Sequence, residues 1–182
     1  MTEYPDNYKT LRRNIYVMRN GIVADSLRRG GCPHRLIYGV NLPQLTEIAR
    51  QTGVSAELAG LLRQDKDLRE ARLMAPMLYP VEELTYDDAL DWAHEVRWIE
   101  DADILCFKLL RRAPFADRLA AALCGEDDRL SRYTGLRLWF NIVGQHPSEA
   151  LAAAESELKR PDPLSQLASM LAEEARFLMN PD

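Results

Sequence analysis

Apolar residues recur at the three- and four-residue spacing of α-helices throughout this chain, and almost no stretch alternates apolar with polar residues. The last apolar stripe is a clear example, with Leu164, Leu167, Ala168, Leu171, Ala175 and Leu178. Such spacing places the apolar side chains on one face of a helix, which packs against a core. No Asn-Gly or Asp-Gly turn separates two β-branched runs, so the sequence gives no signal for a β-hairpin. The chain is therefore predicted to be all-α.

Capping residues and prolines mark where the predicted helices begin and end. Asn41 stands two residues before Pro43, and an N-cap residue followed by proline in the first turn is a strong helix start. Thr85 is followed three residues later by Asp88, a pattern that resembles a capping box. Pro76 is expected to kink or shorten the helix in which it lies. The segments that link the predicted helices are short, which favours antiparallel packing of neighbouring helices.

Paired helices recur along the chain at a spacing of roughly 35 to 45 residues, the size of the two-helix unit in HEAT-type arrays. The residue letters themselves do not visibly repeat. We therefore predict a single domain over residues 1–182, built as a right-handed stack of antiparallel helix pairs, a HEAT-like α-α superhelix. A compact irregular helix bundle is the alternative.

Charge is unevenly distributed in a chain whose net charge is -5 and whose sequence pI is about 5.3. An acidic total counts against a nucleic-acid-binding coat over the whole surface, but it permits a basic strip. Two basic series are present: Lys9, Arg12, Arg13, Arg19, Arg28, Arg29 and Arg35, then Lys108, Arg111, Arg112, Arg118, Arg129, Arg132 and Arg137. Helical arginines are also common on an ordinary solvated face, so both interpretations stay open here.

The three cysteines, Cys32, Cys106 and Cys124, form no C-x-x-C pair, which favours a reducing cytoplasmic compartment. No apolar run resembles a signal peptide or reaches the length of a membrane span. The histidines form no spacing typical of a metal site or a nucleophilic triad, and there is no glycine-rich phosphate loop. We therefore expect neither a metal nor a cofactor.

The most informative stretch runs from Glu95 to Arg112 and reads E-V-R-W-I-E-D-A-D-I-L-C-F-K-L-L-R-R. An amphipathic helix is expected to end at Trp98, and a helix that is apolar nearly all round is expected to follow the acids Glu100, Asp101 and Asp103. A carboxylate in the first turn of a helix faces the positive end of the helix dipole, which favours its ionised form. In a groove, that carboxylate stabilises positive charge in a substrate. Facing open water, it is only a helix-start acid.

Four segments of the chain resemble the bacterial DNA-alkylation-repair glycosylases of the AlkD type, which are HEAT-like repeat proteins. Residues 38–45, Y-G-V-N-L-P-Q-L, are similar to the family's G-V-x-x-P-x-L helix entry, and residues 68–75, L-R-E-A-R-L-M-A, to its E-A-R/K-x-L-A helix. Glu100 and Asp103 are placed like the two acids of its W-D-x-x-D segment. Residues 132–135, R-Y-T-G, are similar to its R-R-x-A or R-R-x-G segment. The resemblance covers about residues 10 to 145.

This resemblance implies a concave basic surface that holds duplex DNA by its backbone and releases alkylated purines such as 3-methyladenine and 7-methylguanine. It assigns the catalytic carboxylate to Asp103, which stabilises positive charge near the sugar and orients water. It assigns a contact with the DNA backbone to Arg132. The chain departs from the family pattern at Ile99, where the family has an aromatic residue, and at Tyr133, where it has a second basic residue.

Each candidate site residue also has a purely structural alternative. Asp103 is a catalyst or a helix-start acid, and Trp98 lines a DNA groove or packs in the core between repeats. Arg132 and Arg35 contact phosphates or pair with nearby acids. The leading hypothesis is a protein that binds duplex DNA and excises N3- or N7-alkylated purines with Asp103. The second is a non-catalytic HEAT-like scaffold that binds DNA or another protein.

Overall fold

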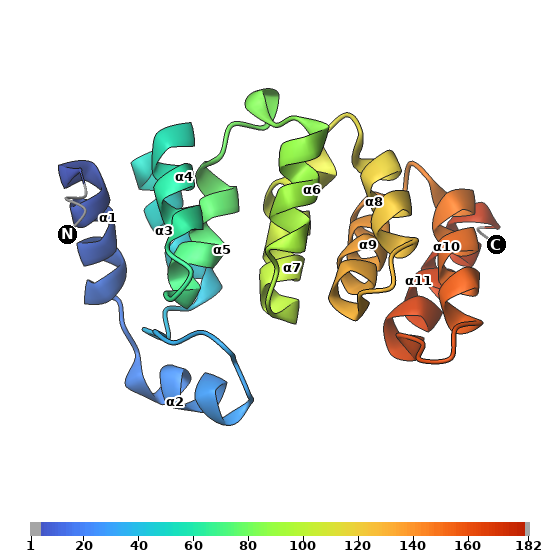
Figure 1. The fold of residues 1–182 in the computed structure, drawn as a ribbon, viewed down its shortest axis with the longest axis horizontal. Coiled ribbons are helices and arrows are strands. Elements are labelled where there is room, and N and C mark those ends of the chain that lie inside the picture. Colours follow the sequence, from blue (N-terminus) through green and yellow to red (C-terminus); the bar gives the residue numbers. More distant parts are fainter. Residues whose placement is uncertain (1–4, 181–182) are drawn as a thin grey trace. The chain divides into compact units, whose positions relative to one another are not determined.

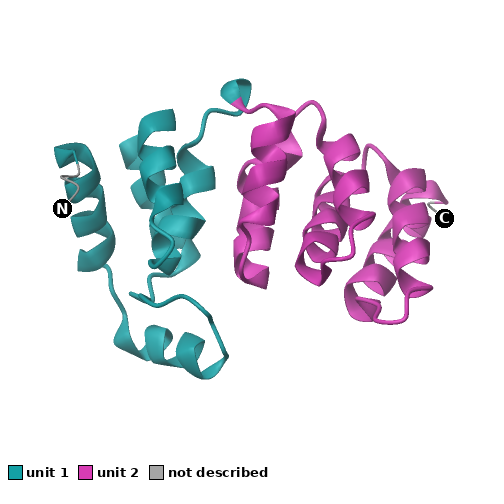
Figure 2. Cartoon of the chain, in the orientation of Figure 1, with its two compact units in different colours: residues 1–83 teal, residues 84–182 magenta. Residues whose placement is uncertain are grey.

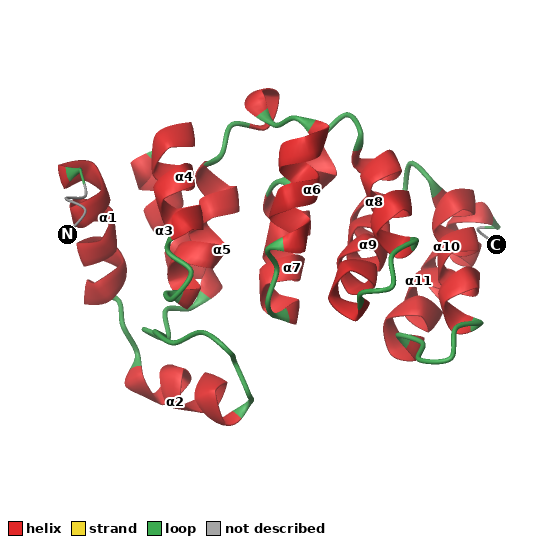
Figure 3. Cartoon of the chain, viewed as in Figure 1, coloured by secondary structure: helices red, strands yellow, loops and turns green. Residues whose placement is uncertain are grey.

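The structure, a computed structural model, describes residues 5–180. Its regular secondary structure is helical, apart from an isolated bridge between Leu36 and Leu68 (Figure 3). The chain divides into two compact units, Met1–Glu83 and Leu84–Asp182, coloured separately in Figure 2. The all-α prediction is confirmed. A single domain over residues 1–182, and the hand of a continuous stack, stay predictions.

The N-terminal unit contains five α-helices among its described residues (Figure 1). They are α1 (Asp6–Val17), α2 (Gly21–Arg29), α3 (Leu42–Thr52), α4 (Ala56–Gln64) and α5 (Arg69–Leu78), followed by the short helix η1 (Val81–Glu83). Helix α5 packs against α3 and α4, and α1 covers the other side of that pair. The core consists of apolar side chains from these helices, among them Tyr8, Leu11, Ile15, Leu45, Leu62, Leu73 and Met74.

The predicted helix starts are confirmed at Asn41 and Thr85. The Asn41 side chain accepts a hydrogen bond from the Gln44 N–H, and the Gln44 side chain accepts one from the Asn41 N–H, which completes a capping box. Thr85 accepts from the Asp88 N–H at the start of α6 (Tyr86–His94). Pro76 lies inside α5, which ends two residues later. These features could be predicted from the sequence because each one depends on residues within a single turn of helix.

A buried carboxylate ties two distant segments of the N-terminal unit together. Glu70, at the start of α5, is fully buried and accepts hydrogen bonds from the backbone N–H groups of Tyr38, Gly39 and Val40 at 3.1, 2.9 and 3.2 Å. The guanidinium of Arg69 lies 2.9 Å from the same carboxylate. The segments 38–45 and 68–75, which were both noted in the sequence, therefore meet in space, and their shared role is structural.

The C-terminal unit is a two-layered array of helices. After α6 come α7 (Ile99–Lys108), the short helix η2 (Leu110–Arg112), α8 (Ala116–Cys124), α9 (Arg129–Ile142), α10 (Pro147–Leu158) and α11 (Ser165–Met179). Helices α7, α9 and α11 contact one another in one layer, and α6, α8 and α10 form the other. The pairs α8–α9 and α10–α11 join the layers. This is the helix-pair arrangement that the sequence predicted.

Gly135 allows α9 to approach α8 very closely. A Cβ atom at this position would lie 2.8 Å from the backbone nitrogen and the sulfur of Cys124 and 2.9 Å from the Ala120 carbonyl oxygen. Only a residue without a side chain fits so close a crossing. The glycine of the R-Y-T-G segment is thus explained by helix packing.

Two details of the central stretch differ from the prediction. Helix α6 ends at His94, four residues before Trp98, and Trp98 is the N-cap residue of α7. Because α7 begins at Ile99, its first turn contains Glu100 and Asp101, and Asp103 lies in the second turn. The effect of the helix dipole falls off within the first turn, so it contributes less to Asp103 than expected.

Among residues 5–180, no helix combines the length and the apolar character needed to cross a membrane.

Candidate functional site

Asp103 lies between two side chains of the neighbouring helix α9. The Nε atom of Arg137 is 2.7 Å from Oδ1 of Asp103, and the hydroxyl of Tyr133 donates a hydrogen bond to the same oxygen at 3.0 Å. The Arg137 N–H is not aligned for a hydrogen bond, so its contact is an ion pair. Within residues 5–180, no hydrogen bond reaches the other carboxylate oxygen, Oδ2. One oxygen of the carboxylate is therefore held by two side chains, and the other accepts no hydrogen bond from the described residues.

The packing of α7 against α9 explains this arrangement. Tyr133 and Arg137 are four residues apart on α9, so both face the same side of that helix. Helix α9 contacts α7 along that side, where Cys106 donates a hydrogen bond to the Thr134 carbonyl at 3.5 Å. Asp103 is one turn before the buried Cys106 on α7 and reaches the edge of the interface. The cluster is thus built from two packed helices rather than from loops.

The Asp103 cluster is partly exposed. The side chains of Asp103 and Arg137 are 32% and 33% exposed, respectively. Burial raises the pKa of Asp103 above its ordinary value, and the charge of Arg137 and the hydrogen bond from Tyr133 offset only part of that rise. Burial, together with the charge of Asp103, also raises the pKa of Tyr133 to about 12. The tyrosine is therefore a hydroxyl donor at neutral pH.

A cavity of about 400 Å³ opens beside this cluster on the layer formed by α7, α9 and α11. Its wall includes Ile99, Arg129, Tyr133, Arg137, Leu164 and Met170. Two of these residues contact Asp103, and Ile99 precedes it by four residues on the same face of α7. Small-molecule sites occupy cavities of about 300 to 1,000 Å³. Asp103 is not part of the cavity wall, but it contacts two residues that are, and the cavity is of suitable size for a small ligand.

The family pattern has an aromatic residue at the position of Ile99, and the tryptophan of this chain, Trp98, stands one position earlier. Trp98 is half-buried at the N-cap of α7, and Ile99 is 48% exposed and lines the cavity beside Asp103. A one-residue step along a helix is a rotation of about 100°. The residue of the wall that lies four positions before Asp103 is therefore aliphatic, and the aromatic ring of the wall comes from Tyr133 on α9.

Arg132 lies in a buried ion-pair network. Its side chain is 2% exposed, and its Nε atom is 3.2 Å from the carboxylate of Glu157, which is 3% exposed. Its two terminal nitrogens donate to the Asp127 carbonyl at 2.6 Å and to the Asp162 carboxylate at 3.0 Å. This position matches the ion-pairing alternative for Arg132, since each nitrogen of the guanidinium contacts an oxygen atom of the protein.

Arg35 lies in the N-terminal unit on the link between α2 and α3. Its side chain is 71% exposed and forms an ion pair with Asp67, which is 48% exposed. Among residues 5–180, Asp103 pairs with Arg137 and accepts a hydrogen bond from Tyr133, and neither of these was a predicted DNA contact. Among the described residues, no group of three or more His, Cys, Asp or Glu side chains is arranged to hold a metal ion.

Comparison with known proteins now places the chain. A family described as "DNA alkylation repair enzyme" matches residues 12–180. The chain belongs to the DNA alkylation repair enzyme family. No curated protein matches it significantly. The resemblance noted in the sequence is thus confirmed at the level of the family.

A solved structure confirms the HEAT-like fold class of this family member. It matches with a TM-score of 0.67 and 15% sequence identity, over 92% of this chain and 83% of the other. It is described as belonging to "a new family of proteins related to the HEAT-like repeat DNA glycosylases with affinity for branched DNA structures". At this level of identity, the likeness concerns the fold alone.

The residue that sequence reasoning missed at the site is Arg137. It was noted only as one member of a basic series. The available signal was its spacing from Tyr133, because residues four apart on a helix share a face. Nothing in the sequence, however, placed that face against Asp103 rather than against solvent.

Proposed function

We propose that this protein binds duplex DNA and releases N3- or N7-alkylated purines by hydrolysing their N-glycosidic bond, with Asp103 as the catalytic carboxylate. The observation that supports this most directly is the placement of Asp103, which is one-third exposed and contacts, through Oδ1, two residues that line a cavity of about 400 Å³. Membership of the DNA alkylation repair enzyme family supports the choice of DNA as partner.

The proposed chemistry needs little more than a well-placed anion. An alkylated purine of this kind is cationic, so it leaves with the electrons of the glycosidic bond and becomes neutral. Positive charge then develops on the sugar, and water adds to the sugar carbon and loses a proton. A preorganised carboxylate stabilises that developing charge in a site of low dielectric constant. Oδ2 of Asp103 is the atom available for this role.

Arg137 and Tyr133 are positioning residues in this scheme. Both contact Oδ1, so together they restrict rotation of the carboxylate. Oδ2 accepts no hydrogen bond from the described residues. Arg137 and Arg129 also border the cavity and carry positive charge toward it. Contacts of Trp98 and Arg35 with DNA remain part of the proposal. The phosphate contact predicted for Arg132 does not, because that side chain is buried.

The decisive experiment measures release of methylated bases from a methylated DNA duplex by the wild-type protein and by Asp103→Asn. Removing one electrostatic contact at a transition state typically costs a factor of about 100 to 1,000 in rate, and we expect a loss of that order. Asp87→Asn is the matched control, because Asp87 is an exposed acid in the first turn of α6. Equal release by wild type and Asp103→Asn would remove Asp103 from the mechanism.

A second candidate function is DNA binding without base release. The observation that favours it is the short distance, 2.7 Å, between Arg137 and Asp103, because a paired cation cancels much of the field that the carboxylate would exert on a sugar. The similar structure described as having affinity for branched DNA points the same way.

Titration of labelled duplex and four-way-junction DNA at increasing salt separates these functions. Binding through phosphates weakens steeply with salt. Tight, salt-sensitive binding without release of methylated bases would favour the second candidate. If neither DNA binds even at low salt, a scaffold for protein partners becomes the better interpretation.

A further inference from the structure

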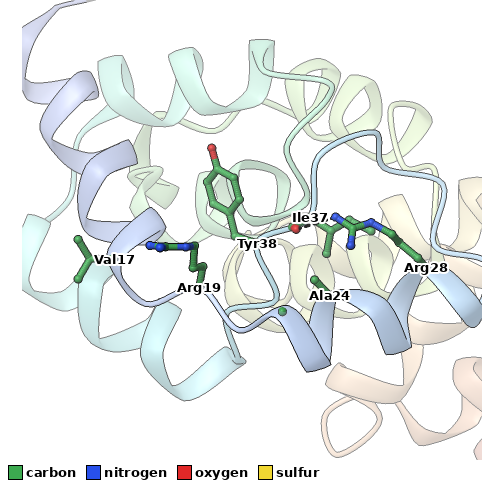
Figure 4. Close-up of a pocket in the computed structure, with 7 residues that line it drawn as sticks. Val17, Arg19, Ala24, Arg28, Ile37 and Tyr38 are labelled. Atoms are coloured by element: carbon green, nitrogen blue, oxygen red, sulfur yellow. Dashed lines mark hydrogen bonds between the residues drawn. The ribbon is translucent and has the colours of Figure 1, made fainter.

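The N-terminal unit contains a second cavity, of about 450 Å³, where the end of α1, the start of α2 and the segment Ile37–Tyr38 meet. Two arginines, Arg19 and Arg28, border it together with Tyr38. Figure 4 shows the two arginines apart from each other, with Tyr38 and Ile37 between them. It belongs to the other unit of the chain from Asp103, so it is a separate site.

The walls of this cavity are held in place by the fold. The Asn20 N–H donates to the Tyr38 carbonyl at 2.8 Å, which joins the start of α2 to the segment opposite. Gly39 has a φ of 76°, and a Cβ there would lie 2.2 Å from the Asn20 carbonyl oxygen. On the other side, the buried carboxylate of Glu70 accepts the N–H groups of residues 38–40. The cavity is therefore preformed rather than a chance gap between side chains.

One of the two arginines at the cavity has no acidic partner within residues 5–180. Arg19 forms no ion pair with an acid of residues 5–180; its guanidinium lies 4.2 Å from the centre of the Tyr16 ring and donates to the Tyr16 carbonyl. Arg28 pairs with the exposed Asp25 at 2.8 Å and donates to the Ile37 carbonyl at 3.3 Å. Residues 5–40 contain seven Lys or Arg and only two Asp, in a chain whose net charge is -5. An anion is the ligand that this surface favours.

Exposed flat and apolar groups surround the charges. Tyr16 is 47% exposed, and its ring meets that of Tyr38 edge-on at 5.2 Å. Val17 and Ile22, on either side of the α1–α2 link, are 65% and 82% exposed. Proteins bind unpaired bases by stacking them on aromatic rings and guanidinium planes, beside arginines that hold the phosphates. A paired duplex hides the faces of its bases, so this mixture suits a single strand better than a duplex.

We propose that the N-terminal unit binds a single-stranded segment of DNA, with a phosphate between Arg19 and Arg28 and an unpaired base against Tyr16 and its stacked guanidinium. Only the choice of DNA rests on the proposed function of the protein; the single-strand chemistry rests on the cavity itself. The site would take the unpaired strand that a branch or a flap presents beside a duplex.

The test is fluorescence anisotropy of the full chain with a labelled oligothymidine, the same sequence as RNA, and a blunt duplex of equal length. We expect oligothymidine binding to weaken roughly tenfold in Tyr16→Leu, which keeps apolar surface but removes the stacking ring. Arg19→Gln should lower the slope of log affinity against log salt by about 0.7, the value for one phosphate contact on a single strand. Arg50→Gln is the matched control, because Arg50 is an exposed arginine of the same unit.

Circular dichroism melting of each variant separates loss of binding from loss of folding. Failure of the wild-type protein to bind oligothymidine would overturn the proposal. So would equal weakening by Tyr16→Leu and Arg50→Gln, or a loss confined to the duplex. Tighter binding of the RNA than of oligothymidine would overturn the choice of DNA as the ligand of this site. Oligothymidine contains no alkylated purine, so this measurement stands or falls separately from base release by Asp103.

Discussion

Each unit of the chain buries an arginine–glutamate pair, and the two pairs differ in which member makes most of the hydrogen bonds to the backbone. In the N-terminal unit, Glu70 holds backbone N–H groups of residues 38–40 while Arg69 neutralises it. In the C-terminal unit, Arg132 holds backbone carbonyls of Asp127 and Asp162 while Glu157 neutralises it. Arg69 also donates to the Val40 carbonyl at 3.2 Å, and Glu157 also accepts from the Leu164 N–H at 2.9 Å. The acid therefore makes most of the backbone hydrogen bonds in one unit, and the base makes most of them in the other; that member of each pair is its anchor.

The difference shows what selects a buried charge in this fold. Every buried backbone N–H and carbonyl needs a partner, and loops leave such groups unpaired. A carboxylate accepts from N–H groups, and a guanidinium donates to carbonyls. The sign of the buried anchor therefore follows from the groups that each loop leaves unpaired, and it says nothing about what the protein binds.

The same contrast extends to the exposed charges. Beside its anchor, the N-terminal unit leaves cations such as Arg19 facing the cavity between α1 and α2. The C-terminal unit instead leaves the carboxylate of Asp103 accessible beside its own cavity. We infer that function resides in the partly exposed charges and that the buried ones maintain the fold. The predictions below test that division.

The largest effect is expected from truncating either anchor. Removing one partner of a buried ion pair leaves the other charge uncompensated, at a cost of about 3 to 5 kcal/mol. Arg132→Ala and Glu70→Ala should each lower the free energy of unfolding of their own unit by that amount. All three tryptophans of the chain lie after residue 83, so tryptophan fluorescence in urea reports Arg132→Ala, and circular dichroism reports Glu70→Ala.

Exposed partners of the same type serve as controls for the anchors. Arg129→Ala lies on the same helix as Arg132, and Glu47→Ala removes an acid of an exposed pair on α3. Both should change the free energy of unfolding by no more than about 0.5 kcal/mol. If Arg132→Ala and Arg129→Ala are equally stable, burial does not distinguish them and the comparison fails.

An intermediate effect is expected at Gly39, where the Glu70-anchored segment passes α2. An alanine there must adopt a left-handed backbone conformation, at about 1 to 2 kcal/mol, and its Cβ must also clash with the Asn20 carbonyl. Gly53→Ala isolates the first cost, because Gly53 has a φ of 81° with open space around it. Urea unfolding should show Gly39→Ala as the less stable variant. Equal losses would mean that the close approach contributes nothing.

The smallest effect on stability is expected from Tyr133→Phe, which removes one hydrogen bond from Asp103 at a cost of about 1 kcal/mol. The more informative readout is the pH dependence of base release. The pKa of Asp103 is raised by burial, and the Tyr133 hydroxyl lowers it. Release should require the ionised carboxylate, so its acid limb should have a midpoint above the ordinary aspartate value. In Tyr133→Phe that midpoint should move to still higher pH.

The stability of the fold should respond to pH in the opposite direction at this residue. A carboxyl with a raised pKa holds its proton more tightly in the folded state than in the unfolded state. Its contribution to the free energy of unfolding therefore falls as the pH rises from the ordinary aspartate pKa through the raised one. Asp103→Asn should remove that slope. An unchanged pH profile in both variants would show that Asp103 does not control either process.

Much of the fold could be predicted from local patterns. The apolar spacing predicted helices, and the caps at Asn41 and Thr85 lie where those patterns placed them. Trp98 was the exception, since a large apolar residue fits the end of one helix and the start of the next equally well. The structure assigns it to the start of α7.

Less of the site could be predicted. The sequence identified Asp103 as a candidate, but its position in the second turn and its contact with Arg137 depend on how α7 packs against α9. For Arg35 the sequence left open a phosphate contact or an ion pair, and the structure shows an ion pair with Asp67. Its role in binding DNA stays a prediction.

By itself, the sequence determined the all-helical class, the starts of α3 and α6 and the family, because each is read from patterns within short segments of the chain. Only the tertiary structure decided which charges face the interior. Arg132 and Arg137 are five residues apart on one helix, yet the first is enclosed by Glu157 and Asp162 and the second meets Asp103 at a partly exposed edge. Helix periodicity gives each side chain a direction, but only the neighbouring helices determine what that side chain meets.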